Sequence, residues 1–267
     1  MKKLILMLAF IALMIPVTIL AGCVRVDLAE KSGPITTQQY SFTDFTGIDI
    51  GHAFELVVTP SENYSIAITA GENVLKNIDV HKDGSTLVID IDGWTDIWFF
   101  SWQSSPKVTI TMPVLNELKL SGASQANVHG FKSSHDFDLE LSGASELDID
   151  METGDFAADI SGASQINGRL IAANSDMELS GASQMNLTGS GVDIRIHGSG
   201  ASKVDMIGFA VNDADIEFSG ASYASLTING RMNVSLSGAS KLEYAGSPTL
   251  GDIETSGASS IEQMALQ

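Results

Sequence analysis

From residue 42 onward, hydrophobic and polar residues alternate in short runs that are separated by turn residues. Alternation with a period of two is typical of β-strands that bury one face, because successive side chains of a strand point to opposite sides. No segment shows the sustained period of about 3.6 residues that an amphipathic helix requires. The first part of this region therefore predicts strands at residues 48–50, 54–58, 64–69, 78–80, 87–91 and 108–112.

A repeated tetrapeptide, Ser-Gly-Ala-Ser, divides the rest of the chain. Its copies lie 18 to 21 residues apart and begin at Ser121, Ser142, Ser161, Ser180, Ser199, Ser219, Ser237 and Ser256. Alternating residues precede and follow each copy, so each unit offers short strands with one buried face. A repeat length of about 19 residues predicts one coil of a β-solenoid, in which each strand pairs in parallel with its equivalent in the next coil. A propeller blade needs about 40 residues and is a poorer fit.

Alignment of the coils on the tetrapeptide predicts two inward-pointing apolar columns. The column before the tetrapeptide holds Leu118, Leu139, Ala158, Met177, Ile196, Ile216, Val234 and Ile253. The column after it holds Ala126, Leu147, Ile166, Met185, Val204, Ala224, Leu242 and Ile261. Gly-Ala is expected to form the corner, because glycine adopts backbone dihedrals that other residues avoid. The flanking serines are expected to hydrogen-bond along the stack.

Outward columns of polar residues alternate with the apolar ones. Neighbours in a column of a parallel solenoid lie about 4.8 Å apart, so stacked carboxylates repel each other unless they share a cation or hold a proton. Calcium binds six to eight oxygens, which a carboxylate ladder can supply. A calcium-binding face is one hypothesis, and its candidate ligands are Asp138, Glu140, Asp159, Asp176 and Glu178. The alternative is a solvated acidic face, since the chain contains no calcium-binding nonapeptide repeat or EF-hand loop.

A further outward column holds Asn127, Asp148, Asn167, Asn186, Asp205, Ser225, Glu243 and Glu262. Polar ladders of this kind stabilise a stack by mutual hydrogen bonds. A carbohydrate groove is the functional alternative for the same column.

All three tryptophans of the chain fall in one segment, residues 93–103, between two predicted strands. The candidate ligand-binding residues of this segment are Trp94, Trp98, Phe99, Phe100 and Trp102. Aromatic clusters on loops suit sugar stacking, a partner hot spot or a membrane interface. The alternative is a hairpin that caps the end of the solenoid and covers its unpaired edge.

The N-terminus has the organisation of an export signal. Lys2 and Lys3 precede an apolar run over residues 4–21. The run ends at Leu-Ala-Gly-Cys, which resembles the bacterial lipobox and implies that a lipid is attached to Cys23, the only cysteine. An uncleaved anchor helix is the alternative. We expect a signal peptide at 1–22, a lipidated tether at 23–40 and a β domain at 41–267, with an N-terminal part at 41–115 and regular coils at 116–267.

Removal of the signal would change the net charge from −19 to −21, because it removes two lysines and no acid. Such a surface repels nucleic acid. It would attract cations and basic partners, although acidic surfaces also serve solubility alone.

The repeats resemble those of the putative auto-transporter adhesin, head GIN domain family. The resemblance covers residues 42–267: an opening Phe-x-x-Ile-x-Ile at 45–50, a Met-Pro-x-Leu-x-x-Leu segment at 112–118, the tandem coils, and Tyr-Ala-Gly-Ser-Pro at 244–248. It implies a right-handed parallel β-helix and an adhesin-like role, and it offers no catalytic residues.

The sequence therefore predicts a non-catalytic, lipid-anchored protein of the cell envelope that binds envelope or host glycans or proteins outside the cytoplasm. It requires no cofactor apart from the calcium hypothesis. The histidines are scattered, and no nucleophile elbow or phosphate-binding loop is present. Two other roles stay open: a polysaccharide-processing enzyme, since β-helix folds carry such sites, and a purely structural envelope protein.

Overall fold

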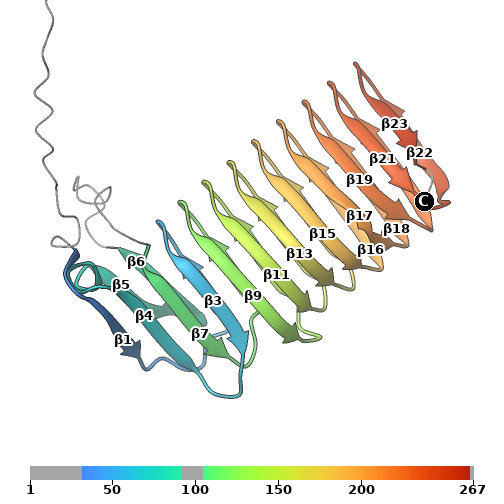
Figure 1. The fold of residues 1–267 in the computed structure, drawn as a ribbon. Helices are drawn as coiled ribbons and strands as arrows, with labels where there is room; N and C mark the ends of the chain where they lie inside the picture. The colour runs from blue at the N-terminus through green and yellow to red at the C-terminus, as the bar shows by residue number, and fades with distance from the viewer. Residues whose placement is uncertain (1–31, 92–104, 265–267) are drawn as a thin grey trace, which may run out of the picture.

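The computed structural model describes residues 32–91 and 105–264. The fold is a β-solenoid of about 8 turns with a coil spacing near 19 residues, and strands make up 63% of it against 2% helix. These features confirm the predicted all-β solenoid. Figure 1 shows the coils stacked one behind the next from β3 to β23.

Two long sheets form the two sides of the solenoid. Sheet A has 12 strands, in the order β1 (Ile35–Tyr40), β4 (Ser65–Gly71), β7 (Lys107–Met112), β3 (Glu55–Pro60), β9 (Gln125–Lys132), β11 (Glu146–Glu152), β13 (Gln165–Ile171), β15 (Gln184–Ser190), β17 (Lys203–Val211), β19 (Tyr223–Ile228), β21 (Lys241–Ala245) and β23 (Ser260–Gln263). Sheet B has 11 strands, in the order β22 (Thr249–Thr255), β20 (Arg231–Leu236), β18 (Asp213–Phe218), β16 (Asp193–Gly198), β14 (Ser175–Leu179), β12 (Phe156–Ile160), β10 (Phe137–Leu141), β8 (Glu117–Leu120), β2 (Gly47–Ile50), β6 (Thr86–Ile91) and β5 (Ile78–Asp83).

The core lies between the two sheets and consists of the predicted inward columns. Leu139 pairs with Leu118 and Ala158 in sheet B, and Leu147 pairs with Ala126 and Ile166 in sheet A. The pairing continues in the same register to the last coil. The burial pattern of β10 and β12 alternates strictly between buried and exposed residues. The period of two in the sequence therefore distinguishes residues that point into the solenoid from residues that point outward.

The Ser-Gly-Ala-Ser segments form the corner at one end of each coil, as predicted. The turn glycines have positive φ, for example +73° at both Gly162 and Gly181. The N–H of Ala182 donates to the Gly162 carbonyl oxygen at 2.8 Å, and the same bond recurs from coil to coil.

The predicted hydrogen bonds of the serines along the stack are confirmed in several coils. Ser202 and Ser222 are joined between coils (3.1 Å). The hydroxyls of Ser183 and Ser161 donate to carbonyl oxygens of the preceding coil, those of Ile160 (3.3 Å) and Leu141 (3.4 Å). The second serine of the tetrapeptide also bonds within its own turn, as from Ser183 to the carbonyl oxygen of Ser180 at 2.9 Å, so the serines stabilise both the turn and the stack.

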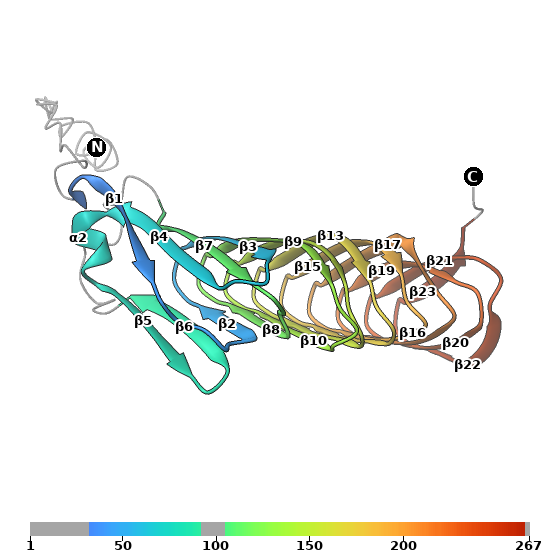
Figure 2. The same ribbon diagram turned by 90° about the horizontal axis from the view of Figure 1, so that it is seen from below.

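Antiparallel strands close the N-terminal end (Figure 2). β4 pairs antiparallel with β7, β1 pairs antiparallel with β4, and β5 pairs antiparallel with β6. The short helix α2 (Glu72–Leu75), which the sequence pattern did not predict, packs its buried Val74 and Leu75 at this end. β1 corrects the expected tether of 23–40, because residues 35–40 form an edge strand. β1 is held by backbone pairing, and its exposed polar residues left no alternation to detect.

Parallel stacking also begins earlier than residue 116. β2 and β3 already pair in register with β8 and β9. β6 and β7 stack on the other side of β2 and β3. The end of β6 at Ile91 and the start of β7 at Lys107 therefore lie at the corner where the turn glycines of the later coils lie.

Candidate binding site

A groove of about 640 Å³ follows the N-terminal ends of the sheet B strands, at the corner opposite the turn glycines. Six successive strands, from β10 to β20, contribute to its lining. With neighbouring strands about 4.8 Å apart, the groove is about 24 Å long and runs along the solenoid axis. Its polar lining residues are Asp136, Asp138, Asp155, Asn174, Ser175, Asp176, Asp193, Arg195, Asp213, Asp215, Arg231 and Asn233.

One row of these side chains holds the corner together. Asp155 Oδ1 accepts hydrogen bonds from the backbone N–H and the side-chain amide of Asn174, both at 3.0 Å. Asp213 Oδ1 accepts from the N–H of Arg231 at 2.7 Å, and Asp136 Oδ1 accepts from the N–H of Asp155 at 2.9 Å. The sequence pattern did not predict this row, although its residues stand directly before the first inward residue of each of the strands β10 to β20. These bonds fix the carboxylates at one wall of the groove.

The second row belongs to the predicted outward column, which the structure confirms: Asp138 pairs with Glu117 and Ala157 in the register of the sheet. Asp138, Asp176 and Asp215 present carboxylates here, and Arg195 lies 3.7 Å from Asp176. The exposed Ala157 leaves a gap between Asp138 and Asp176. The groove thus combines carboxylates, amides and guanidinium groups with the apolar side chains of Phe156, Ala157, Ile194 and Ala214, which suits ligands rich in hydroxyl or amino groups.

The candidate calcium ligands lie together on the same face. Asp138, Glu140, Asp159, Asp176 and Glu178 all line a second hollow of about 500 Å³, next to the groove. Within residues 32–91 and 105–264, however, no three His, Cys, Asp or Glu side chains converge closely enough to hold a metal ion. The five carboxylates are spread over three coils and two rows, so an ion would have to draw them together. Calcium binding therefore stays a prediction.

Electrostatic pairing is tightest at the N-terminal end of this face. Thr86 Oγ1 donates to Glu117 Oε2 at 2.8 Å and lowers the pKa of Glu117, and Lys119 lies 3.1 Å from the other oxygen. Burial raises the pKa of the neighbouring Asp49, although Lys119 opposes the shift. The acidic face is therefore partly neutralised here, and its unpaired carboxylates lie further along the solenoid.

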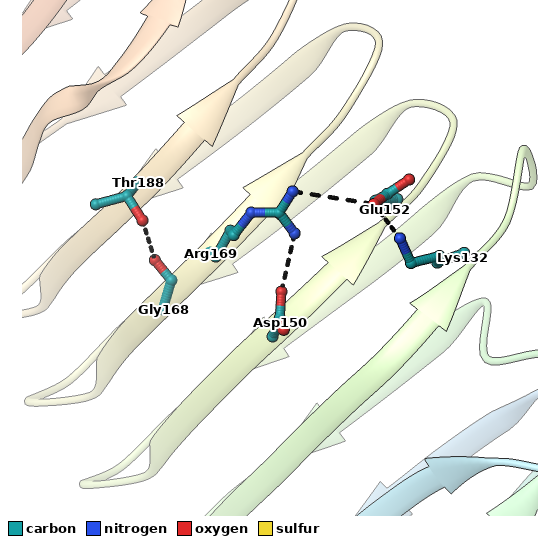
Figure 3. Close-up of polar contacts among 6 residues, drawn as sticks. All are labelled: Lys132, Asp150, Glu152, Gly168, Arg169 and Thr188. Atoms are coloured by element: carbon teal, nitrogen blue, oxygen red, sulfur yellow. Dashed lines mark hydrogen bonds and ion pairs between the residues drawn. The ribbon is translucent and has the colours of Figure 1, made fainter.

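The outer face of sheet A carries compensated charges instead. Figure 3 shows Arg169 bridging two side chains of the adjacent coil, Asp150 at 3.1 Å and Glu152 at 3.9 Å, while Lys132 reaches Glu152 from the other side at 2.7 Å. The predicted polar ladder is confirmed as a hydrogen-bonded stack in part of its length, since Asn186 donates to Asn167 at 2.9 Å. Exposed ion pairs of this kind add little stability. The surplus of carboxylates over Lys and Arg is therefore smaller on the strands of sheet A than on those of sheet B.

Two groups of candidate residues lie outside the described residues: Cys23, and the aromatic set Trp94, Trp98, Phe99, Phe100 and Trp102. The flanks of the aromatic segment are described. Asp90, just before it, lies 2.6 Å from His52 Nδ1, at the turn of the first coil. In the part of the chain that the structure covers, no helix is long and apolar enough to cross a membrane.

Comparisons with known proteins agree with this architecture. The family model of the putative auto-transporter adhesin, head GIN domain, matches residues 44–248. No curated protein matches the sequence.

Solved structures from two Parabacteroides species have the same fold. A putative adhesin from Parabacteroides merdae has a TM-score of 0.80 at 16% identity, over 87% of this chain and 97% of that chain. A putative lipid binding protein from Parabacteroides distasonis has a TM-score of 0.77 at 15% identity, over 87% of this chain and 98% of that chain. A putative adhesin from the same species has a TM-score of 0.74 at 15% identity, with the same coverage. At these identities the likeness establishes the fold alone.

Proposed function

Because the chain belongs to the putative auto-transporter adhesin, head GIN domain family, we propose that it is a non-catalytic, extracytoplasmic protein that binds an extended ligand in the groove along sheet B. The observation that carries the proposal is the continuity of the groove over six successive strands. A globular partner would need a broad surface, whereas a groove about 24 Å long that follows a single corner of the solenoid fits one extended chain.

The chemistry of the lining favours a glycan. Carboxylates, amides and guanidinium groups in a shared groove accept from and donate to hydroxyl groups, which a glycan offers on every residue. Seven aspartates against two arginines give the lining a negative balance. That balance repels phosphate-bearing or uronic-acid polymers and favours neutral or amino-bearing glycans.

The lipid anchor is the second part of the proposal. A lipid on Cys23 would hold the solenoid at a membrane surface by its N-terminal end, and β1 begins only 12 residues after Cys23 (35 − 23). The tether is then shorter than predicted. The groove would project away from the membrane along the solenoid axis.

Filling the gap at Ala157 tests the groove. We expect Ala157→Trp in a soluble form, residues 24–267, to abolish glycan binding while the unfolding midpoint changes little, because Ala157 points outward and is exposed. Binding of a panel of neutral, amino-bearing and anionic glycans would be measured by biolayer interferometry. The matched control is Gln184→Trp, which adds the same side chain at an exposed position of sheet A.

Equal binding by both variants would reject the groove as the site. Shortening of a bound glycan that stops when Asp138, Asp159 and Asp176 are replaced by Asn would instead support the polysaccharide-processing alternative. Calcium is tested in the same assay, by comparing binding in calcium with binding in a chelator.

Replacement of Cys23 tests the anchor. Without the thiol no thioether-linked lipid can form, so the full-length Cys23→Ala chain is expected to lose palmitate labelling and to move from the membrane fraction to the soluble extracytoplasmic fraction. A Ser32→Ala chain, altered in the segment before β1, serves as the control and should stay in the membrane fraction. Retention of the Cys23→Ala chain in the membrane would favour the uncleaved anchor helix.

A further inference from the structure

The two ends of the solenoid differ. At the C-terminal end, β22 is the last strand of sheet B and β23 is the last strand of sheet A. Each pairs on one side only, β22 with β20 and β23 with β21. Among residues 32–91 and 105–264, no strand pairs with their outer edges (Figure 2). The backbone N–H and C=O groups along each outer edge therefore have no strand partner.

The apolar core is open to solvent at the same end. Leu250 is 57% exposed, while Met232, its register partner in the preceding coil, is fully buried. Ile253 is 39% exposed, against 3% for its partner Val234. Large apolar residues in a column are normally covered by the next coil, so this end exposes apolar side chains that another strand or coil could cover.

The N-terminal end shows how this chain closes an edge. β1 places Thr36, Gln38 and Tyr40 opposite the buried residues of β4, so its inward-facing positions are mainly polar. Helix α2 adds buried cover nearby. Polar edge strands discourage further pairing. The C-terminal edge lacks this protection and keeps apolar residues at its inward positions.

The charged residues of the last two strands are all negative. Asp252 and Glu254 lie on β22 and Glu262 on β23, and residues 242–264 contain no Lys or Arg. Two bases of the preceding coil lie next to these strands: Arg231 pairs in register with Thr249 and reaches Gly251, and Lys241 is paired with Glu243 at 2.8 Å and Glu262 at 3.0 Å. End-to-end association of two copies would place these acids against the same acids, which is unfavourable.

We propose that the C-terminal end accepts an extended strand of a partner protein in which apolar residues alternate with Lys or Arg. Pairing with β22 would satisfy the free backbone groups, which is the basis of recognition by strand addition. From Ile253 to Thr255 the alternation matches the edge, since the partner's apolar residues would cover Ile253 and its basic residues would face Glu254; Leu250 lies on the other side of the irregularity in β22. This surface is distinct from the groove and does not depend on the proposed glycan.

The test uses the full chain and two labelled nine-residue peptides of equal composition. One alternates valine and lysine, and the other groups the same valines and lysines in two blocks. We expect saturable binding of the alternating peptide, roughly tenfold tighter than the block peptide, and slower hydrogen exchange in residues 249–255. Leu250→Lys should remove the preference, whereas Ile35→Lys, at an exposed residue on the opposite edge strand, should not.

Three results would overturn the proposal. Equal binding of the two peptides would mean that charge alone attracts them. Tight binding without protection of residues 249–255 would place the site elsewhere. Sedimentation of the free chain as a dimer that Leu250→Lys dissociates would identify a second copy as the occupant.

Discussion

Replacing Gly181 with alanine is expected to lower the free energy of unfolding by about 3 kcal/mol. Gly181 has φ +73°, a left-handed conformation that costs an L-residue about 1–2 kcal/mol. A Cβ at this position would also lie 2.5 Å from the carbonyl oxygen of Gly162 in the preceding turn. That oxygen belongs to the backbone and accepts the bond from Ala182, so it cannot move without loosening the stack.

Gly84→Ala is the matched control. Gly84 also has positive φ, +58°, but nothing lies within 4 Å of the added Cβ. The free energy of unfolding of this variant should therefore fall only by the cost of the left-handed backbone conformation, about 1 kcal/mol. Urea unfolding of the soluble chain followed by circular dichroism would measure both. Similar losses for the two variants would show that the stacked glycines are required for their dihedral alone and not for the close approach of neighbouring turns.

His52 supports the distinction between the cost of the left-handed dihedral and the cost of the contact between a Cβ and the carbonyl oxygen of the preceding turn. It occupies the first position of the same column, with φ +67°, and its carbonyl oxygen faces Gly122 of the next turn. Its side chain pairs with Asp90 of β6, the strand that stacks on the other side of β2. A non-glycine residue is thus tolerated at this turn, whereas the glycine of each Ser-Gly-Ala-Ser turn has a backbone carbonyl oxygen of the preceding turn directly beneath it.

The sequence predicted the regular coils because their pattern depends on local alternation repeated at a constant spacing. Each inward column, from Leu118 to Ile253 and from Ala126 to Ile261, pairs as expected. A parallel stack repeats the same environment in every coil, so one alignment of the sequence fixes all of them. The same regularity predicted the acidic column that lines the groove.

The N-terminal end was less predictable, because no repeat specifies it. β1 is almost fully exposed and is identified only by its pairing with β4. The direction of β4 and β5 depends on tertiary pairing that alternation does not encode. The corner carboxylates, such as Asp155, were not predicted for a different reason. They accept hydrogen bonds from the backbone of the next coil, and a single sequence does not distinguish such aspartates from aspartates that only face solvent.

Replacing Phe156 with alanine is the second change with a large expected effect. Phe156 is 1% exposed and stacks on Phe137 of the preceding coil with ring centroids 6.0 Å apart. Removal of a buried phenyl ring leaves a cavity that a close-packed stack cannot fill, so we expect a loss of about 3–5 kcal/mol. Phe156→Leu retains most of the apolar volume and should lose about 1.5 kcal/mol or less.

The loss should also be local, because each coil contacts only its neighbours. Hydrogen exchange in Phe156→Ala is expected to accelerate most in β10, β12 and β14, and least in β20 and β22. Since Phe156 also lines the groove beside Ala157, glycan binding should weaken in this variant but persist in Phe156→Leu. Uniform acceleration of hydrogen exchange along the whole chain would instead mean that the solenoid unfolds as one cooperative unit. A packing change in one coil would then destabilise every coil and would not act on the groove separately.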